Sequence, residues 1–158
     1  MSNASAPDPS PVPFSTTLLV RDSCLCLHVQ RAARALARRF EEAFRPFDLT
    51  NGQFSLMMSL NRPEPPTMGS VASLLAMDRT TLTAALKPLE RRGLVCVMVD
   101  GKDRRGRRLF LTPQGMDLLA KAAPVWAATH AEVEASLGTL SPGALSPGDL
   151  RAALLALS

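Results

Sequence analysis

The chain has 158 residues, which is long enough for one globular domain with a core and too short for two ordinary independent domains. Its 46% hydrophobic and 20% charged residues exclude a mostly disordered chain. The net charge of +4 is uneven: residues 79–108 hold nine bases and three acids, a net +6, and the remainder carries −2. A local basic segment suits a surface that neutralises phosphates, although it also suits a face that is merely solvated.

The N-terminal residues 1–13 alternate proline with small polar residues and lack the basic and apolar regions of a signal peptide. We expect residues 1–20 to form a disordered tail. No apolar run approaches the roughly 18 residues that cross a bilayer, and three cysteines do not suit a disulfide framework. These features predict a cytoplasmic protein without a membrane partner.

The first half of the chain shows two helices and a loop. An apolar pattern of helical period opens near Asp22 and ends at or before Pro46, because proline disfavours helix in the residue before it. Thr50 and Gln53 have the spacing of a capping box, which predicts the start of a second helix. Three prolines within residues 61–66 predict a loop.

Two further helices follow in close succession. Thr67 is a plausible N-cap of a short helix that stops around Met77, and Asp78 can cap the next helix, over residues 79–92. Gly93 then stands where a helix end favours a left-handed residue. The 79–92 helix separates into an apolar face of Leu82, Leu86 and Leu89 and an opposite face of Thr80, Ala84, Lys87 and Arg91.

The pattern then changes from helix to strand. Residues 94–99 are rich in β-branched types, 100–106 are polar with two glycines, and 107–111 are two arginines followed by Leu-Phe-Leu, which predicts strand, turn and strand. Thr112 and Pro113 form a typical helix start, and a long helix follows to about residue 137. A linker and a short C-terminal helix complete the chain.

A short helix, a turn, an amphipathic helix and a ribbon with a basic tip, in that order, define a winged helix-turn-helix. Such a helix fits a major groove about 12 Å wide, where small side chains approach the edges of the DNA bases and lysine or arginine side chains reach phosphates. An arginine at the ribbon tip can enter a minor groove. Each residue alone is more often merely solvated, but together they predict binding to double-stranded DNA through Arg79, Thr80, Thr81, Thr83, Ala84, Lys87, Arg91, Lys102, Arg104, Arg105 and Arg107.

Three phrases of the sequence resemble the MarR family of winged helix-turn-helix transcription regulators. They are Leu89-Glu90-Arg91-Arg92-Gly93-Leu94-Val95, then Asp103-Arg104-Arg105, then Leu111-Thr112-Pro113-Gln114-Gly115. The resemblance implies that Arg105 enters a DNA groove and that Asp103 orients the wing. It also implies a homodimer, built from the first, fifth and sixth helices of the family fold, on an inverted-repeat operator.

The domain organisation follows from this resemblance. The fold expected is mainly α with a small β-wing, in which a DNA-binding lobe of residues 49–112 is flanked by dimerisation helices over 21–48 and 113–158. The family further implies a repressor whose DNA affinity is relieved by a small, often aromatic, ligand. A pocket lined from His28, Phe54 and Met57 is the hypothesis for that ligand.

An alternative trigger is oxidation of a thiol. Cys24 and His28 are four residues apart, and an imidazolium near a thiol lowers the thiol pKa toward the reactive thiolate. Peroxide-sensing members of the family also carry an early cysteine, but they engage it with tyrosines, and this chain has none. Cys24 and Cys26 also suit small apolar residues of a dimer interface. Because residues two apart on a helix point about 200° apart, we expect no metal site and no cofactor.

Other classes of function have little support in the sequence. No nucleophile-elbow phrase, phosphate-cradling glycine loop or paired ligand set is present, so we expect no enzyme. A dimeric protein-interaction module that has lost DNA binding is a third possibility, and the basic wing argues against it. Pro88 removes a hydrogen bond to Ala84, and we expect any kink to lie past the residues that contact bases.

Overall fold

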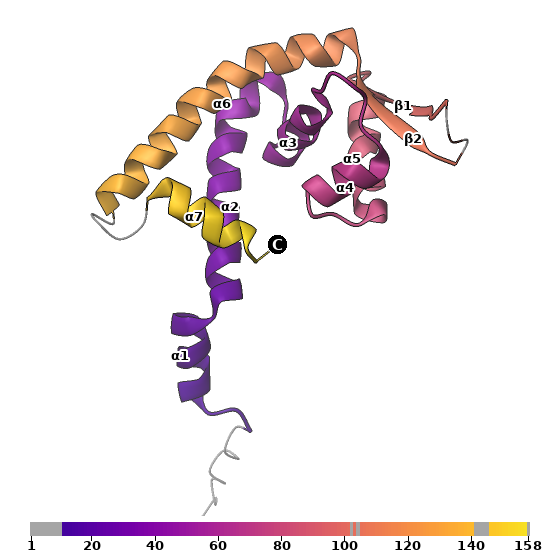
Figure 1. Ribbon diagram of the computed structural model, residues 1–158. Helices are drawn as coiled ribbons and strands as arrows, with labels where there is room; N and C mark the ends of the chain where they lie inside the picture. The colour runs from indigo at the N-terminus through magenta and orange to yellow at the C-terminus, as the bar shows by residue number, and fades with distance from the viewer. Residues whose placement is uncertain (1–10, 102, 104, 141–145, 158) are drawn as a thin grey trace, which may run out of the picture. The chain divides into compact units, whose positions relative to one another are not determined.

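The computed structural model describes residues 11–157 apart from 102, 104 and 141–145, and of 139 and 140 it describes only the backbone. The mainly α fold with a small β-wing is confirmed (Figure 1). The elements are α1 (Phe14–Ser23), α2 (Leu25–Phe44), the 3-10 turn η1 (Arg45–Phe47), α3 (Asn51–Leu60), α4 (Met68–Leu74), α5 (Arg79–Arg91), β1 (Val95–Val99), β2 (Arg107–Leu111), α6 (Pro113–Leu140) and α7 (Pro147–Leu155).

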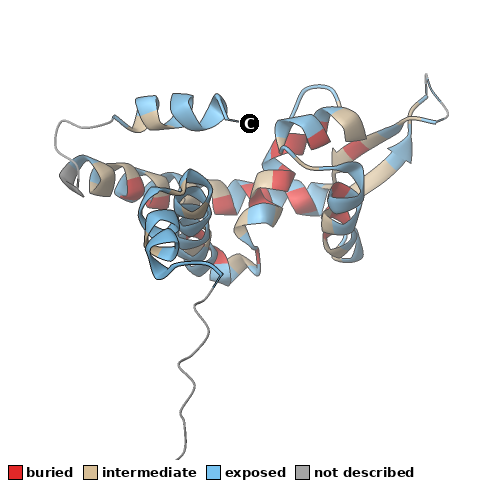
Figure 2. Cartoon of the chain, turned by 90° about the horizontal axis from the view of Figure 1, so that it is seen from below, coloured by how far each residue is buried: buried red, intermediate tan, exposed pale blue. Residues whose placement is uncertain are grey.

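The chain divides into two units, residues 1–36 and 37–158, where composition predicted one compact unit. No residue of 11–36 is buried. Among the described residues, every buried apolar side chain lies in the second unit, and Figure 2 shows these residues in red. The first unit therefore has no core of its own within the residues that the structure describes.

The first unit corrects two sequence predictions. The disordered tail predicted for residues 1–20 is wrong for 14–20, which belong to α1; residues 1–10 lie outside the described part of the chain. Pro13 provides the N-cap of α1, so the prolines that suggested disorder end where the helix begins. The single helix predicted from Asp22 is instead broken at Cys24, whose backbone is extended, with ψ 105°.

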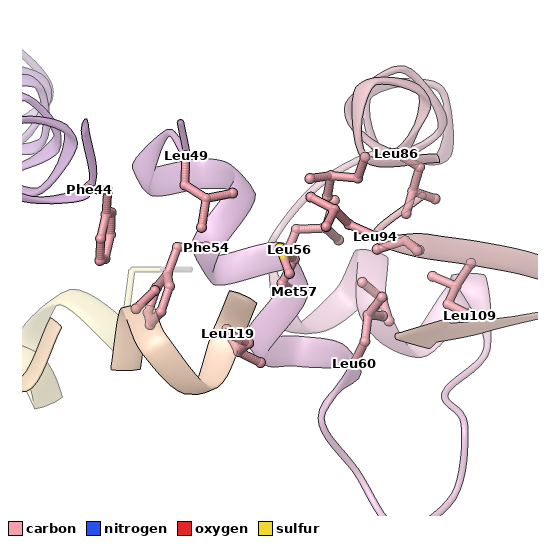
Figure 3. Close-up of a cluster of buried hydrophobic side chains, with 14 of the residues drawn as sticks. Phe44, Leu49, Phe54, Leu56, Met57, Leu60, Leu86, Leu94, Leu109 and Leu119 are labelled. Atoms are coloured by element: carbon pink, nitrogen blue, oxygen red, sulfur yellow. The ribbon is translucent and has the colours of Figure 1, made fainter. Parts of the chain in front are cut away.

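The second unit is organised around one hydrophobic core. Leu82, Leu86 and Leu89 of α5 are at most 2% exposed, which confirms the apolar face predicted for this helix. Side chains of α3, β2 and α6 meet them, including the fully buried Met57 and Leu109, and Figure 3 shows part of the cluster. This core fixes the orientation of α5 within the unit, because an interior packs as closely as an organic crystal.

Local hydrogen bonds start the helices of the second unit where the sequence predicted. Thr50 and Gln53 form both halves of the capping box, and the hydroxyl oxygen of Thr67 accepts from the amide of Ser70 at 3.1 Å. Asp78 caps α5. Gly93 adopts a φ of +68° after α5, which confirms the predicted left-handed position.

A close backbone contact joins the end of α5 to the start of α6. The Thr112 hydroxyl donates to the carbonyl oxygen of Gly93 at 2.6 Å, and the Thr112 amide donates to that of Leu94 at 3.1 Å. A Cβ on Gly115 would lie 2.0 Å from the Leu94 carbonyl oxygen, so only glycine fits there. The Leu-Thr-x-x-Gly phrase therefore forms a structural joint between the end of α5 and the start of α6.

The wing is a two-stranded antiparallel ribbon in which Val95 pairs with Leu111 and Val99 with Arg107. The segment predicted as a loop before α4 adds to it, because Thr67 forms a bridge with Arg108 and the Leu109 amide donates to the Pro66 carbonyl at 3.0 Å. β2 is therefore hydrogen-bonded on both sides at its centre.

The C-terminal helices differ slightly from their predicted ranges. α6 extends to residue 140, past Gly138, where the sequence predicted a linker. Ser146 and Asp149 form a capping box at the start of α7, and the Arg151 guanidinium pairs with Glu134 of α6. That guanidinium lowers the pKa of the Glu134 carboxyl. No helix in the described part of the chain is long and apolar enough to span a membrane.

Candidate nucleic-acid interface

The face of α5 opposite the core carries the predicted DNA-contacting residues. Its apolar face is held by the three buried leucines, so the other face is directed outward by helical geometry alone. All the predicted residues on this helix are exposed: Arg79, Thr80, Thr81, Thr83, Ala84, Lys87 and Arg91. The exposed face combines small side chains near its start with lysine and arginine side chains along its length, which suits close approach to a DNA groove.

Two of these threonines also have roles within the helix. Thr81 donates from its hydroxyl to Asp78 at 2.7 Å and from its amide at 2.8 Å. These hydrogen bonds, with the hydroxyl contribution largest, lower the pKa of the Asp78 carboxyl. The Thr83 hydroxyl donates to the carbonyl of Arg79 at 2.7 Å. The methyl groups of both threonines remain available for apolar contact with bases, while their hydroxyls satisfy the first turn of α5.

The tip of the wing is organised by Asp103. Its carboxylate accepts from the backbone amide of Arg105 at 2.9 Å, and its carbonyl accepts from the amide of Gly106 at 2.8 Å. This Asx-type turn presents Arg105 at the exposed end of the ribbon. Arg107 is exposed at the start of β2. The predicted contacts Lys102 and Arg104 lie outside the described residues.

A hollow of about 470 Å³ separates the wing from the helix-turn-helix. Arg79 and Thr83 of α5 line it together with Arg105 and Arg107 of the wing, the acidic residues Asp100 and Asp103, and the start of α4. The arrangement brings the guanidinium groups of two elements around one concave surface. Such a surface can receive a phosphate backbone, because guanidinium groups match phosphate geometry with paired hydrogen bonds.

Two arginines of the basic segment have structural contacts that the sequence did not reveal. Arg92 donates from its Nη atoms to the carbonyl oxygens of Asp48 and Phe47, at 2.5 and 3.1 Å, and so ties the end of α5 to η1. Arg108 donates to Asp100 and to the Pro65 carbonyl. Neither was among the predicted DNA contacts, but no pattern separated them from the arginines that face solvent.

Pro88 does not end α5. α5 continues to Arg91, and the amide of Arg92 donates to the carbonyl of Pro88 at 3.2 Å. Pro88 lies three turns beyond the cap residue Asp78, after the threonines and Ala84. The hydrogen bond that Pro88 cannot make is the one to the Ala84 carbonyl, so any distortion lies between Ala84 and Pro88, after the threonines.

The predicted sensing residues divide between the two units. Phe54 and Met57 are both buried in the core of the second unit, and Phe54 also lines a hollow with Trp126. In the first unit, Cys24 is half-buried and Cys26 is exposed. Nδ1 of His28 lies 2.8 Å from the Cys24 carbonyl oxygen, so the ring faces the backbone rather than the thiol that the sequence paired with it.

A helix-turn-helix followed by a hydrogen-bonded wing defines a winged-helix protein, and the comparisons identify its family. The model of the MarR family matches residues 49–106. The M. tuberculosis transcriptional regulator MosR, solved in complex with DNA, is 36% identical, with a TM-score of 0.74 over 85% of this chain and 93% of that one. The chain belongs to the MarR family of winged-helix regulators.

Two other relatives extend the comparison. The transcriptional repressor CouR, solved bound to a 23-mer DNA duplex, is 28% identical, with a TM-score of 0.67 over 94% of this chain and 96% of that one. The regulator TtmR of Methylorubrum extorquens is 35% identical over 100 residues, which are 63% of this chain. The chain spans 51% of TtmR and 64% of the Staphylococcus haemolyticus regulator SarZ.

Proposed function

We propose that this chain is a sequence-specific DNA-binding transcription regulator. The observation that carries the proposal is the concave surface on which the exposed face of α5 and the wing arginine Arg105 meet around one hollow. MosR and CouR, which share 36% and 28% identity with the chain, are described in complexes with DNA. In this proposal α5 enters a major groove and Arg105 an adjacent minor groove, where the potential is most negative.

The regulator acts as a homodimer on an inverted repeat. The first unit supports this proposal, because Leu25, Val29 and Leu36 of α2 are 40–72% exposed. In α7, Leu154 and Leu155 are also exposed. A helix with an exposed apolar face gains stability when another helix packs on that face. We assign residues 21–48 and 113–158 to dimerisation and 49–112 to DNA binding.

The first experiment selects bound sequences from a random duplex pool and measures affinity for the selected site against salt, with wild type and Arg105→Ala side by side. An inverted repeat, a steep salt dependence and a loss of affinity with Arg105→Ala support the proposal. Sedimentation of Val29→Asp tests the dimer, which this charge should dissociate. An unenriched pool together with an unaffected Arg105→Ala variant contradicts DNA binding and favours a protein-interaction module.

We further propose that the chain is a repressor whose DNA affinity a small aromatic ligand relieves. A hollow of about 340 Å³ lies between Phe54, Leu75 and Trp126, with the Ser55 and Ser59 side chains at its wall. Phe54 stacks between Phe44 and Trp126, with ring centroids 4.6 and 6.4 Å away, and Trp126 stacks in turn on His130 at 4.8 Å. Two rings of this stack therefore line the hollow, and an aromatic ligand can pack against them.

The ligand proposal is tested with benzoate as the probe. Trp126 is the one tryptophan of the chain, so its fluorescence reports binding directly. Ser55→Leu, which fills the hollow, should abolish both the fluorescence change and the release of DNA. Ser23→Leu, on the exposed face of α1, should retain both. Equal responses of the two variants would contradict this site.

Oxidation is the second candidate trigger, favoured by an exposed Cys26 beside a half-buried Cys24 at a helix break. One peroxide molecule would oxidise the thiol of Cys24 or Cys26 to a sulfenic acid and be reduced to one water molecule. DNA release by peroxide that is lost in Cys24→Ser or Cys26→Ser, and kept in Cys96→Ser, supports this trigger. A peroxide response that survives both substitutions contradicts it.

A further inference from the structure

We propose that Arg108 and Asp100 form a clasp that positions the wing arginine Arg105, and that Arg108 does so without contacting DNA itself. This inference rests on the proposed DNA-binding function and assigns a positioning role to two residues of the same surface. It gives a basic and an acidic side chain of the wing a joint function that their charges alone would not suggest.

The geometry of the clasp joins three segments of the chain. Nε of Arg108 donates to Oδ2 of Asp100 at 2.9 Å, and Nη1 of Arg108 donates to the Pro65 carbonyl at 2.8 Å. The side chains are 31% and 13% exposed, so solvent screens this pair less than a surface ion pair. A planar guanidinium can serve two acceptors in fixed directions, which an ammonium group cannot do.

A chain of hydrogen bonds connects the clasp to Arg105. The Asp100 amide donates to the Gly106 carbonyl at 3.0 Å, and the Gly106 amide donates to the Asp103 carbonyl at 2.8 Å. Asp103 in turn holds the Arg105 amide at 2.9 Å. A Cβ on Gly106 would lie 3.1 Å from the Asp100 Cβ, so the loop is closed tightly against Asp100. A displaced Asp100 would therefore displace the turn that presents Arg105.

The same clasp ties the wing to the helices that carry α5. Pro65 precedes Thr67, which bridges to Arg108 and caps α4, and α4 packs on α5. Arg108 therefore spans the ribbon and the helix-turn-helix. Because a misplacement of about 1 Å is enough to weaken a designed contact, this link sets how well Arg105 and α5 can engage one duplex together.

Because Asp100 is negatively charged, the proposal and a purely electrostatic role predict opposite changes in DNA affinity when this charge is removed. Asp100 is an acid in a segment of net charge +6. If only electrostatics mattered, removing this negative charge would strengthen binding to DNA phosphates. If the clasp positions Arg105, the isosteric Asp100→Asn substitution weakens binding, because a neutral amide oxygen holds the guanidinium less strongly than a carboxylate.

The experiment measures affinity for the selected operator in full-length wild type, Asp100→Asn and Arg108→Lys, over a range of salt. We expect each substitution to weaken binding about tenfold, the effect of losing a charge-assisted hydrogen bond. The salt dependence should stay that of wild type, whereas loss of a phosphate contact reduces the slope by about 0.9. Arg108→Lys keeps the charge, so a phosphate-contacting role would leave its binding nearly intact.

The same substitutions in an Arg105→Ala background test whether the clasp acts through Arg105. We expect their effects there to fall below about twofold, because interacting residues are non-additive. The midpoints of thermal unfolding, measured on all variants, distinguish a displaced wing from an unfolded protein.

The outcomes separate the two proposals. Tighter binding by Asp100→Asn, normal binding by Arg108→Lys, or full effects in the Arg105→Ala background would each overturn the clasp and leave DNA binding standing. Wild-type protein that selects no DNA would overturn the proposed function, and the clasp with it.

Discussion

The two units of this chain have similar helical sequences but opposite patterns of burial. In α2, the apolar side chains of Leu25, Val29 and Leu36 recur with helical period, and all three are at least 40% exposed. In α5, the corresponding pattern of leucines is completely covered. The difference shows that an amphipathic pattern predicts a helix and its apolar face, but not which surface covers that face.

The largest expected effect is a loss of stability in the second unit, caused by a substitution at the backbone contact between Gly115 and Leu94. Gly115→Ala places a Cβ 2.0 Å from the Leu94 carbonyl oxygen, so we expect a loss of about 4 kcal/mol or more in the free energy of unfolding, measured by urea titration. Gly138→Ala on the same helix is the control, because a Cβ at this position would meet nothing within 4 Å. That change should stabilise the protein by up to about 1 kcal/mol. Equal effects would contradict the joint.

The next effect compares a leucine from each unit. Leu82→Ala empties a site with 0% exposure and should cost about 2–5 kcal/mol of unfolding free energy. Leu25→Ala removes a side chain that is 72% exposed, so it should leave the unfolding of the second unit within about 0.5 kcal/mol and weaken self-association. Urea titration and sedimentation measure the two effects. A stability loss from Leu25→Ala without a change in association would contradict the contrast.

A smaller effect concerns the start of α3. Thr50→Ala removes the hydroxyl that accepts from the Gln53 amide, which is one of the two hydrogen bonds of the capping box, and should lower the free energy of unfolding by about 1 kcal/mol. Thr17→Ala, on the exposed surface of α1, is the matched change in the first unit and should have an effect within about 0.5 kcal/mol. Thermal unfolding of both variants provides the comparison, and a larger loss in Thr17→Ala would reverse it.

The smallest effect is a pH dependence. The pKa of Asp78 is lowered in the folded chain by hydrogen bonds from Thr81, so its stabilising contribution is present above the unfolded pKa and disappears as pH falls through the folded value. Asp78→Asn should therefore flatten the acid side of the stability profile.

Asp22 provides the control in the first unit. Arg21 lowers its pKa, but the two residues are neighbours and can also pair in the unfolded chain. Asp22→Asn should leave the stability profile unchanged. Unfolding midpoints between pH 3 and 7 measure both variants, and a flattened profile in Asp22→Asn alone would contradict the assignment.

The site was predictable where local chemistry determines it. The caps Thr50, Thr67 and Asp78 and the left-handed Gly93 act within a few residues of their own position, and all four were identified from spacing. The exposed face of α5 followed from helical period. By contrast, Arg92 and Arg108 reach carbonyl groups more than forty residues away, which no local pattern encodes.

The sequence by itself determined the order of the elements from α3 onward, the caps of α3, α4 and α5, the winged-helix class and the family, because these depend on hydrophobic period, backbone restrictions and a few short phrases. Only the tertiary structure decided that Arg92 and Arg108, among the described arginines of the basic segment, brace α5 and the wing. Arginines look alike in a sequence, and their roles depend on acceptors that the fold brings close from distant segments. The break at Cys24 and the orientation of His28 were decided in the same way, by backbone geometry that composition does not specify.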